Sequence, residues 1–321
     1  MTIIPYIWLR TNSPRPSLLF LLWLRIGMFN DALGCYSLSF KNGNESSPQR
    51  PVGRRRGFFP LFRITGDGTP YKFPCTEISF RQEWSNNWPF TKNDFARIDY
   101  YNDGLFYALP RLVYHVDEPA VCALTQHYRR SIEKNSDILD ICSSWVSHYP
   151  TEFPETMNSI RATGMNPIEL FFNDQLTDGF VVADLNGDDI INKPSNAVDE
   201  GIDKAGRDLF AAYDDESFDV VTCALSIDYL IDPVKVLRGC NRILRSGGKV
   251  IVSFSNRCFG TKAIRVWRLN KNSFHVELVN AFFKFAGNYK TPTAYEITPT
   301  IPDKTQKFRD PLFVIEAVKR W

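Results

Sequence analysis

The residues with the clearest chemical potential follow a short apolar segment near the middle of the chain. Asp140 lies in the run Ile138–Cys142, and Ser143, Ser144 and Trp145 follow it. A strand that ends with an acidic residue and opens into a tight turn is where layered α/β folds hold a nucleotide-like cofactor. Glycines normally bring the backbone close to such a ligand, whereas here small serines leave room and offer hydroxyls for a carboxylate. A strand end with a serine-rich turn and no ligand is the alternative.

Polar residues follow other apolar runs in the same way. Asp184 and Leu185 come at the end of one run, and Ser226, Asp228 and Tyr229 follow another. Seven runs have the length and bounds of strands: Ile138–Cys142, Ser159–Ala162, Phe180–Asp184, Phe218–Ala224, Lys249–Phe254, Ala294–Thr298 and Leu312–Val318. Four stretches are predicted helical: Pro119–Lys134, Pro167–Leu176 with Asn166 as its N-cap, Pro233–Leu244 and Ser273–Phe285.

These elements predict an α/β fold. Strand runs that are apolar on both faces and alternate with helices indicate a mostly parallel sheet covered on both sides. In such sheets a ligand binds at the carboxyl ends of the strands. We therefore expect the polar residues that follow the strands to meet at one edge of the sheet.

One longer stretch resembles a known family. The strand that begins Phe218-Asp219 leads through a loop to a helix that begins at Asp232-Pro233, and that helix ends in Arg242-Ile243-Leu244-Arg245-Ser246-Gly247-Gly248 before the strand Lys249–Phe254. The chain resembles the class I S-adenosylmethionine-dependent methyltransferases, in particular the branch called methyltransferase type 11. The resemblance extends over about Ile138–Val318. Two further phrases, Phe254–Lys262 and Gly164–Leu170, are similar to an uncharacterised subgroup of that branch.

The resemblance implies a Rossmann-like, mostly parallel seven-stranded sheet with helices on both faces and a C-terminal antiparallel strand pair, and S-adenosylmethionine as cofactor. By position, Asp140–Trp145 would line the methionine portion, Asp184 and Leu185 would approach the adenine, and Ser226–Tyr229 would border the reacting centre. The predicted cofactor-binding residues are Asp140, Cys142, Ser143, Ser144, Trp145, Asn166, Asp184, Leu185 and Ser226. Two positions depart from the family: serines replace glycines, and Gly164, beside Met165 and Asn166, replaces the acid that holds the ribose.

Methyl transfer needs alignment and, for a protonated acceptor, a base. Among the four histidines, His115 lies just ahead of the first predicted helix, where a lid would cover the cofactor, so His115 or Asp117 is a candidate, with capping and packing as the alternative. Asp228 and Tyr229 are the positional candidates for contact with substrate or cofactor. Arg257 would pair with an acidic acceptor or form a surface salt bridge. His127 is expected to lie at the surface or to pack, and nothing singles out His148 or His275.

Three functions remain open from the sequence: an active methyltransferase, with a small molecule more expected as acceptor than a macromolecule; a catalytically degenerate methyltransferase-like binding scaffold; and a dinucleotide oxidoreductase. The third is disfavoured because no G-x-G-x-x-G follows the first strand. The sequence selects neither the acceptor nor the oligomeric state.

No metal site is expected. Asp184–Asn192 resembles the start of a calcium loop, but Asp189 occupies the position that requires glycine, and Ser195 the position of the bidentate glutamate. The seven cysteines show no C-x-x-C spacing, which argues against zinc and against a disulfide framework.

The charge distribution separates the N-terminal part from the rest. Residues 1–64 hold nine basic and two acidic residues, a net charge of +7, so the remainder carries −5 of the formal total of +2. A mildly acidic globular part does not suit a nucleic-acid backbone. Leu18–Leu24 is apolar but is followed by Arg25, so it is too short to span a membrane and we expect no stable insertion. A plastid or mitochondrial targeting segment fits this composition, with a cytoplasmic protein as the alternative.

We therefore predict three parts: a targeting or disordered basic extension over residues 1–64, a cap layer over 65–118, and the methyltransferase-like domain over 119–321. The segment Thr76–Val116 is dense in aromatic and arginine side chains without a clean period, so it reads as an irregular layer packed on a larger body. Its aromatic stretch Phe80–Tyr107 would either cover the sheet, which we favour, or form the acceptor pocket.

Overall fold

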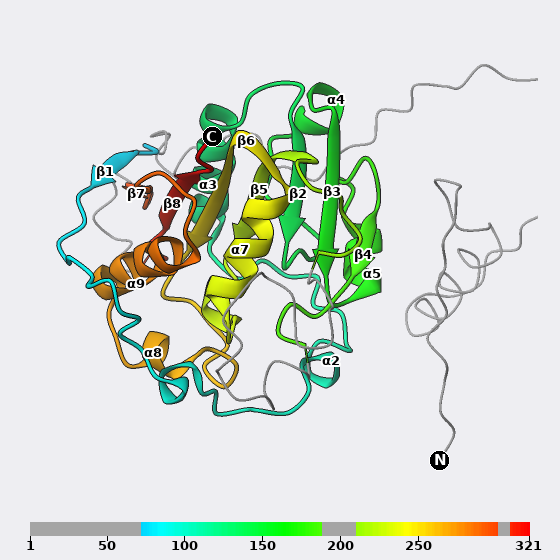
Figure 1. Cartoon of the computed structure of the whole chain (residues 1–321). Coiled ribbons are helices and arrows are strands. Elements are labelled where there is room, and N and C mark those ends of the chain that lie inside the picture. The colour runs from blue at the N-terminus through cyan, green and yellow to red at the C-terminus, as the bar shows by residue number, and fades with distance from the viewer. Residues whose placement is uncertain (1–71, 188–209, 301–308) are drawn as a thin grey trace, which may run out of the picture. The chain divides into compact units, whose positions relative to one another are not determined.

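A computed structural model describes residues 72–187, 210–300 and 309–321. They belong to one compact unit, Pro60–Trp321, built around an eight-stranded sheet with the order β1-β7-β8-β6-β5-β2-β3-β4 (Figure 1). The five strands from β4 to β6 are parallel to one another. The strands β8, β7 and β1 complete the sheet through antiparallel pairings.

The seven predicted strands are all present. They are β2 Asp137–Ile141, β3 Ser159–Gly164, β4 Phe180–Val182, β5 Phe218–Ala224, β6 Leu244–Phe254, β7 Thr293–Glu296 and β8 Phe313–Val318. The sequence did not reveal β1, Thr76–Ile78, which lies in the predicted cap layer and pairs with β7. The predicted Rossmann-like sheet with an antiparallel pair at its C-terminal side is confirmed, extended by this additional edge strand.

The two faces of the sheet bury different helices. Successive side chains of a strand point to opposite faces, so Val220 packs in one apolar cluster and Val221 in the other. The face of Val221 is covered by α7, Pro233–Ile243, and α9, Asn272–Ala286. The face of Val220 is covered by α3, Glu118–Ser131. In Figure 1 α7 and α9 accordingly lie in front of the sheet and α3 behind it.

Capping residues fix where the helices begin. Asp117 accepts a hydrogen bond from the Ala120 amide at the start of α3, and Asp232 accepts one from the Lys235 amide at the start of α7. Asn166 caps α5, Pro167–Phe172, as predicted, although α5 ends four residues before Leu176. The remaining helices are short: η1 Lys92–Phe95, α2 Asp103–Phe106, α4 Phe153–Thr156, η2 Ile227–Tyr229 and α8 Arg265–Arg268.

Gly247 and Gly248 lie in a turn near the start of β6, and the structure shows why both positions need glycine. Gly247 has a φ of +79°, in the left-handed region. A Cβ on Gly248 would lie 2.8 Å from the Asp219 carbonyl oxygen. The strand β6 begins at Leu244, earlier than the predicted Lys249. Leu244 pairs with Phe218, and the register of the two strands shifts after this pair.

The described part of the predicted cap layer, residues 72–118, packs on the same unit. Phe80, Phe90 and Phe95 pack against the apolar cluster under α9. Trp84 donates a hydrogen bond to the Glu277 carbonyl of α9, and Trp88 contacts Phe285 edge to face at 5.0 Å. Most of the aromatic stretch thus covers the body of the protein, as favoured above. The boundary at residue 118 stays a prediction, and the extension 1–64 lies outside the described residues.

Two other expectations concern regions that are only partly described. Among the described residues, no helix is both long enough and apolar enough to cross a membrane. Within these ranges, no group of three or more His, Cys, Asp or Glu side chains has an arrangement that would hold a metal ion. The rejected calcium loop continues past Gly187 into residues 188–209, which lie outside the described ranges.

Candidate functional site

A cavity of about 280 Å³ lies where β2, β3, β4 and β5 end. The turns after these strands and the segment Asp103–Val116 form its walls. All the predicted cofactor-binding residues line it: Asp140, Cys142, Ser143, Ser144, Trp145, Asn166, Asp184, Leu185 and Ser226. Of the three predicted catalytic residues, His115 and Tyr229 line the cavity and Asp228 does not.

The turn after β2 reaches the conformation that glycine usually supplies without a glycine. Cys142 has a φ of +55°, and Leu225, which follows β5, has a φ of +53°. Both residues line the cavity. For an L-residue this left-handed backbone costs roughly 1–2 kcal/mol, so packing around these turns must hold it in place.

Asp140 lies beneath this turn and is buried. The Thr222 hydroxyl donates to its Oδ1 at 3.0 Å. Burial raises the pKa of Asp140 to about 6, against the lowering effect of hydrogen bonds from Ser147, Ser143 and Thr222. The carboxyl therefore organises the turn from below, through the hydroxyls around it.

The serine hydroxyls of the turn are engaged within the protein. Ser144 donates to Glu169 Oε2 at 2.5 Å. Asn173, at the end of α5, donates through Nδ2 to the Ser144 carbonyl at 3.0 Å and to the Ser147 hydroxyl at 2.9 Å. Gln175 Oε1 accepts hydrogen bonds from the backbone amides of Ser147 and Tyr149. Side-chain bracing from residues 169–175 thus fixes the loop, a role that the sequence did not indicate.

At the end of β3, Gly164 replaces the acid that the family places there, and the carboxylate of Glu169 lies nearby. A Cβ on Gly164 would lie 2.2 Å from the Ser143 carbonyl oxygen, so no side chain fits there. Asn166 uses its amide to cap α5 and to donate to the Tyr107 carbonyl at 2.7 Å. Glu169, one helical turn further on, is buried and lines the cavity, and its Oε1 accepts a hydrogen bond from the Arg111 amide at 2.6 Å. Nothing in the sequence distinguishes Glu169 from an ordinary helix residue.

At the other end of the cavity, Asp184, Leu185 and Asn186 follow β4. Asp184 accepts a hydrogen bond from the Asn186 amide at 2.8 Å, and burial raises the pKa of its carboxyl. Leu185 is buried and supplies an apolar surface. Asn186 accepts a hydrogen bond from the Ile231 amide through Oδ1 and donates through Nδ2 to the Tyr229 carbonyl and to Asp103. This asparagine therefore joins three walls of the cavity.

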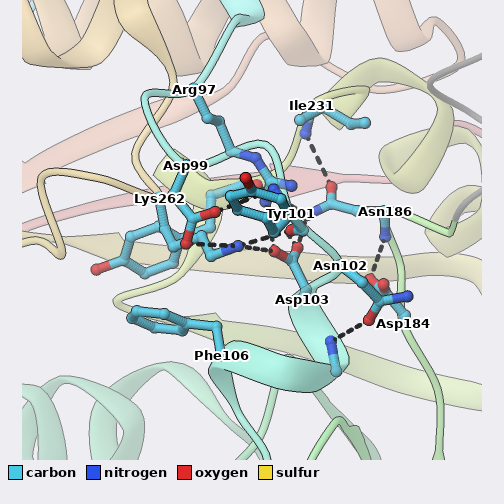
Figure 2. A network of polar contacts seen from close by, with 12 residues as sticks. Arg97, Asp99, Tyr101, Asn102, Asp103, Phe106, Asp184, Asn186, Ile231 and Lys262 are labelled. Carbon is cyan, nitrogen blue, oxygen red and sulfur yellow. Dashed lines mark hydrogen bonds and ion pairs between the residues drawn. The ribbon is translucent and has the colours of Figure 1, made fainter.

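Asp103 is the centre of a buried ionic network, which Figure 2 shows. Arg97 donates to both its oxygens, at 2.9 and 2.6 Å, and Lys262 Nζ lies 2.8 Å from Oδ1. Lys262 also lies 3.1 Å from Asp99 and donates to the Tyr101 carbonyl at 2.9 Å. Arg97, Asp103 and Lys262 have almost no exposed side-chain surface. The network ties the segment 97–103 to the loops after β4 and β6.

Aromatic rings and one guanidinium complete the wall on the cap side. The Arg111 guanidinium lies over the Phe106 ring at 4.4 Å and over the Phe259 ring at 5.3 Å. The Tyr229 ring lies 5.9 Å from that of Phe259, and the Tyr114 ring 5.1 Å from that of Trp145. Aromatic faces of this kind attract cations, including ligand cations.

Two histidines face the cavity. His115 stands at its rim with its ring 5.2 Å from that of Phe259, and desolvation, with Arg111 contributing, lowers the pKa of His115. His148 is buried, has a φ of +61°, and burial lowers its pKa to about 4. Both side chains are therefore neutral at pH 7. The sequence singled out only the first.

Asp228 and Tyr229 occupy different places in the wall. The Tyr229 hydroxyl accepts a hydrogen bond from the Phe259 amide at 2.8 Å, and burial raises the pKa of Tyr229 well above its usual range. Asp228 is buried in η2, and burial raises its pKa to about 8. Tyr229 thus positions the loop after β6, while Asp228 is a protonated carboxyl at neutral pH.

The remaining candidates have structural partners. Asp117 caps α3 and exchanges backbone–side-chain hydrogen bonds with Asp310. Arg257 lines the cavity, but its exposed guanidinium pairs with Asp310 at 2.5 Å. His127 is buried and pairs with Glu316 of β8 at 2.8 Å, so of the two alternatives it packs. His275 stacks on Trp267 with 3.8 Å between ring centroids.

Comparison with known proteins gives three findings. Residues 182–252 match the family model described as Methyltransferase domain. The chain is 39% identical over 56 residues to a ubiquinone biosynthesis O-methyltransferase of Xanthomonas oryzae pv. oryzae, which is 17% of this chain and 23% of that protein. It is 45% identical over 40 residues to the protein of the same name from Pseudomonas paraeruginosa, which is 12% of this chain and 17% of that one. The matches span less than a quarter of these relatives' length.

Two solved structures illustrate the similarity in three dimensions. A putative methyltransferase from Bacillus halodurans is 14% identical with a TM-score of 0.39, over 63% of this chain and 99% of that one. Phosphoethanolamine N-methyltransferase 2 from Haemonchus contortus, in complex with S-adenosyl-L-methionine, is 16% identical with a TM-score of 0.40, over 62% of this chain and 52% of that one.

The strand order, the antiparallel strands at one end of the sheet and the cavity at the carboxyl ends of the parallel strands agree with the Rossmann-like fold that the sequence predicts. The family match begins at the last residue of β4 and covers β5, α7 and most of β6, which include the motifs that carried the resemblance. Over residues 182–252 the chain therefore matches the methyltransferase domain family, in agreement with the resemblance found in the sequence.

Proposed function

We propose that this chain transfers a methyl group from S-adenosylmethionine to a small-molecule acceptor. One observation carries the proposal: the turns after β2, β4 and β5, which lie far apart in sequence, meet at one cavity that all the predicted cofactor-binding residues line. The turn Cys142–Trp145 leaves this space open, so the substituted serines do not fill the site.

The residues around the cavity fit an adenosyl sulfonium. The turn Asp140–Trp145 would hold the methionine portion, and Asp184 and Leu185 would hold the adenine. Glu169 would supply the carboxylate for the ribose hydroxyls, because Gly164 has no room for a side chain. Aromatic rings on the cap side suit a positively charged sulfur. When bound, the cofactor supplies an electrophilic methyl group.

A hydroxyl is the acceptor group that this site suits best. His115 is neutral at pH 7 and stands at the rim, so it is our candidate for the base that removes a hydroxyl proton. Tyr229 and Asp228 keep their protons at that pH, and we assign Tyr229 to positioning the wall and Asp228 to shaping the turn after β5. The two relatives above are O-methyltransferases by name, which agrees with this choice.

The experiment is a turnover assay with the purified full chain, S-adenosylmethionine carrying a labelled methyl group, and a panel of phenols, catechols, amines and thiols. We expect label transfer to at least one hydroxylated compound. Transfer only to amines or thiols would contradict the hydroxyl assignment. Cofactor binding with no turnover on any acceptor would instead favour the binding scaffold, which no feature of the cavity favours now.

The subcellular localisation of the protein is a separate proposal. We infer from the basic, acid-poor composition of residues 1–64 that they direct the protein to a plastid or mitochondrion. A fluorescent protein fused behind residues 1–64 is expected to enter one of these organelles. A uniformly cytoplasmic signal would overturn this inference.

A further inference from the structure

The segment Ile98–Tyr114 of the cap presents apolar side chains to solvent. Eight of the fifteen large hydrophobic side chains that are exposed in the described residues lie in it: Ile98, Tyr100, Tyr101, Leu105, Leu109, Leu112, Val113 and Tyr114. Leu105 and Leu109 are 75% and 77% exposed. In Figure 1 this segment, with α2, runs along the lower edge of the molecule, toward which β2 and β3 point.

The inner side of the same segment is ionic. Arg97 and Asp103 are buried and pair with each other and, through Asp103, with Lys262 (Figure 2). Arg111 turns its guanidinium onto the Phe106 ring and donates to the Phe106 carbonyl. Ordinary surface segments have the reverse arrangement, with apolar side chains inward and charged ones outward. Ion pairs therefore anchor this segment while its leucines and tyrosines point away from the core.

A contiguous group of exposed apolar side chains marks a binding surface. Binding would remove these side chains from water, and each Å² of apolar surface that is buried stabilises the complex by roughly 25 cal/mol. Its chemistry identifies what binds. Within Ile98–Tyr114 the charged residues are Asp99 and Asp103, which pair with Lys262, and Arg111, whose guanidinium faces inward. A protein partner would normally be met by charged rim residues, whereas an uncharged surface of leucine and tyrosine suits the boundary between lipid headgroups and acyl chains.

We propose that the outer surface of Ile98–Tyr114, here called the docking face, binds peripherally to a lipid layer. Val113 and Tyr114 line the cavity and are also exposed, at 56% and 42%, so they lie at its mouth. Docking would place this mouth against the lipid. A lipophilic acceptor would then enter beside Val113 and Tyr114, a consequence that rests on the proposed function.

The test is flotation of the full chain with neutral phosphatidylcholine vesicles, without cofactor or acceptor. The variant Leu105→Asn/Leu109→Asn is compared with Trp321→Asn, a matched control at an 88% exposed apolar side chain. Trp321 packs against Gly247, where β6 begins, at the opposite end of the sheet from the cavity. Both proteins keep residues 1–64, so any lipid binding by that extension cancels in the comparison. We expect the double variant to lower the vesicle partition coefficient about tenfold or more and the control to leave it unchanged.

Equal flotation of the double variant and the wild type would overturn the proposal. So would wild-type chain that stays unbound by vesicles but dimerises in light scattering, since the docking face would then be a protein interface. Thermal denaturation confirms that both variants are folded. Because the assay needs no methyl transfer, an inactive chain that still floats would contradict the proposed function alone.

Discussion

The two halves of the cavity wall are built on different principles. The strand ends and the turns after them hold Asp140, Asp184 and Ser226 where the sheet places them, and strand ends are local features of the sequence. The cap half is held by the pairings of Asp103 with Arg97, Lys262 and Asn186, which come from segments up to 159 residues apart. The sheet thus places one wall at its strand ends, where side chains of residues 169–175 brace it, and buried side-chain charges fix the other.

The largest effect is expected from breaking the ionic network around Asp103, which holds the cap half of the wall. Asp103→Asn leaves two buried cations without their shared carboxylate, and losing one partner of a buried pair costs about 3–5 kcal/mol. Urea denaturation should show this loss of unfolding free energy. Asp178→Asn, which breaks the exposed pair with Arg161, is the control and should cost less than about 1 kcal/mol. Similar losses in the two variants would mean that the network contributes no more than a surface pair.

The second prediction concerns His115, the candidate base at the rim of the cavity. His115→Gln should lower kcat about 100-fold or more because it removes the base, with the cofactor Kd unchanged. The acid limb of the wild-type kcat/KM profile should lie below about pH 6.5, since the pKa of His115 is lowered, and should vanish in the variant. Tyr229→Phe removes only the acceptor for the Phe259 amide and should lower kcat by about tenfold at most. An unchanged kcat in His115→Gln would remove this residue from the mechanism.

The third prediction tests the strand-end wall through the pH dependence of the free energy of unfolding, to which the buried Asp140 carboxyl contributes. The pKa of Asp140 is raised from 3.8 to about 6, so the folded state holds a proton that the unfolded chain has released. This contribution to stability is complete below pH 3.8 and is lost as the pH rises through 6. Between about pH 4 and pH 7 the wild type should lose about 2–3 kcal/mol more than Asp140→Asn. Parallel stability profiles for the two proteins would show that Asp140 titrates normally.

The smallest effect concerns backbone strain in the same wall. Cys142→Gly and Cys142→Ala remove a similar side chain, but only glycine relieves the φ of +55°. Cys142→Gly should therefore be more stable than Cys142→Ala by about 1 kcal/mol, measured by thermal denaturation. The reverse order would show that the loop does not hold a left-handed residue.

The comparison of the two walls also explains what the sequence could predict. Val220 and Val221 belong to a short apolar run, and its length and bounds predict the strand β5. The polar residues that follow such strands predict the strand-end wall of the cavity. Asn166 before Pro167 gave the start of α5 correctly. Three-residue β1 has no such pattern, because it forms only where the edge of β7 is available. Glu169 and Lys262 read as ordinary charged residues, since their burial depends on segments that contact them only in the folded chain.

The most direct measurement is calorimetry of the full chain with S-adenosylmethionine, S-adenosylhomocysteine and NADH. If the strand-end turns form an adenosyl sulfonium site, both sulfur compounds bind, NADH does not, and Glu169→Gln weakens binding of both. Binding of NADH alone, or of neither sulfur compound to folded protein, would contradict the account.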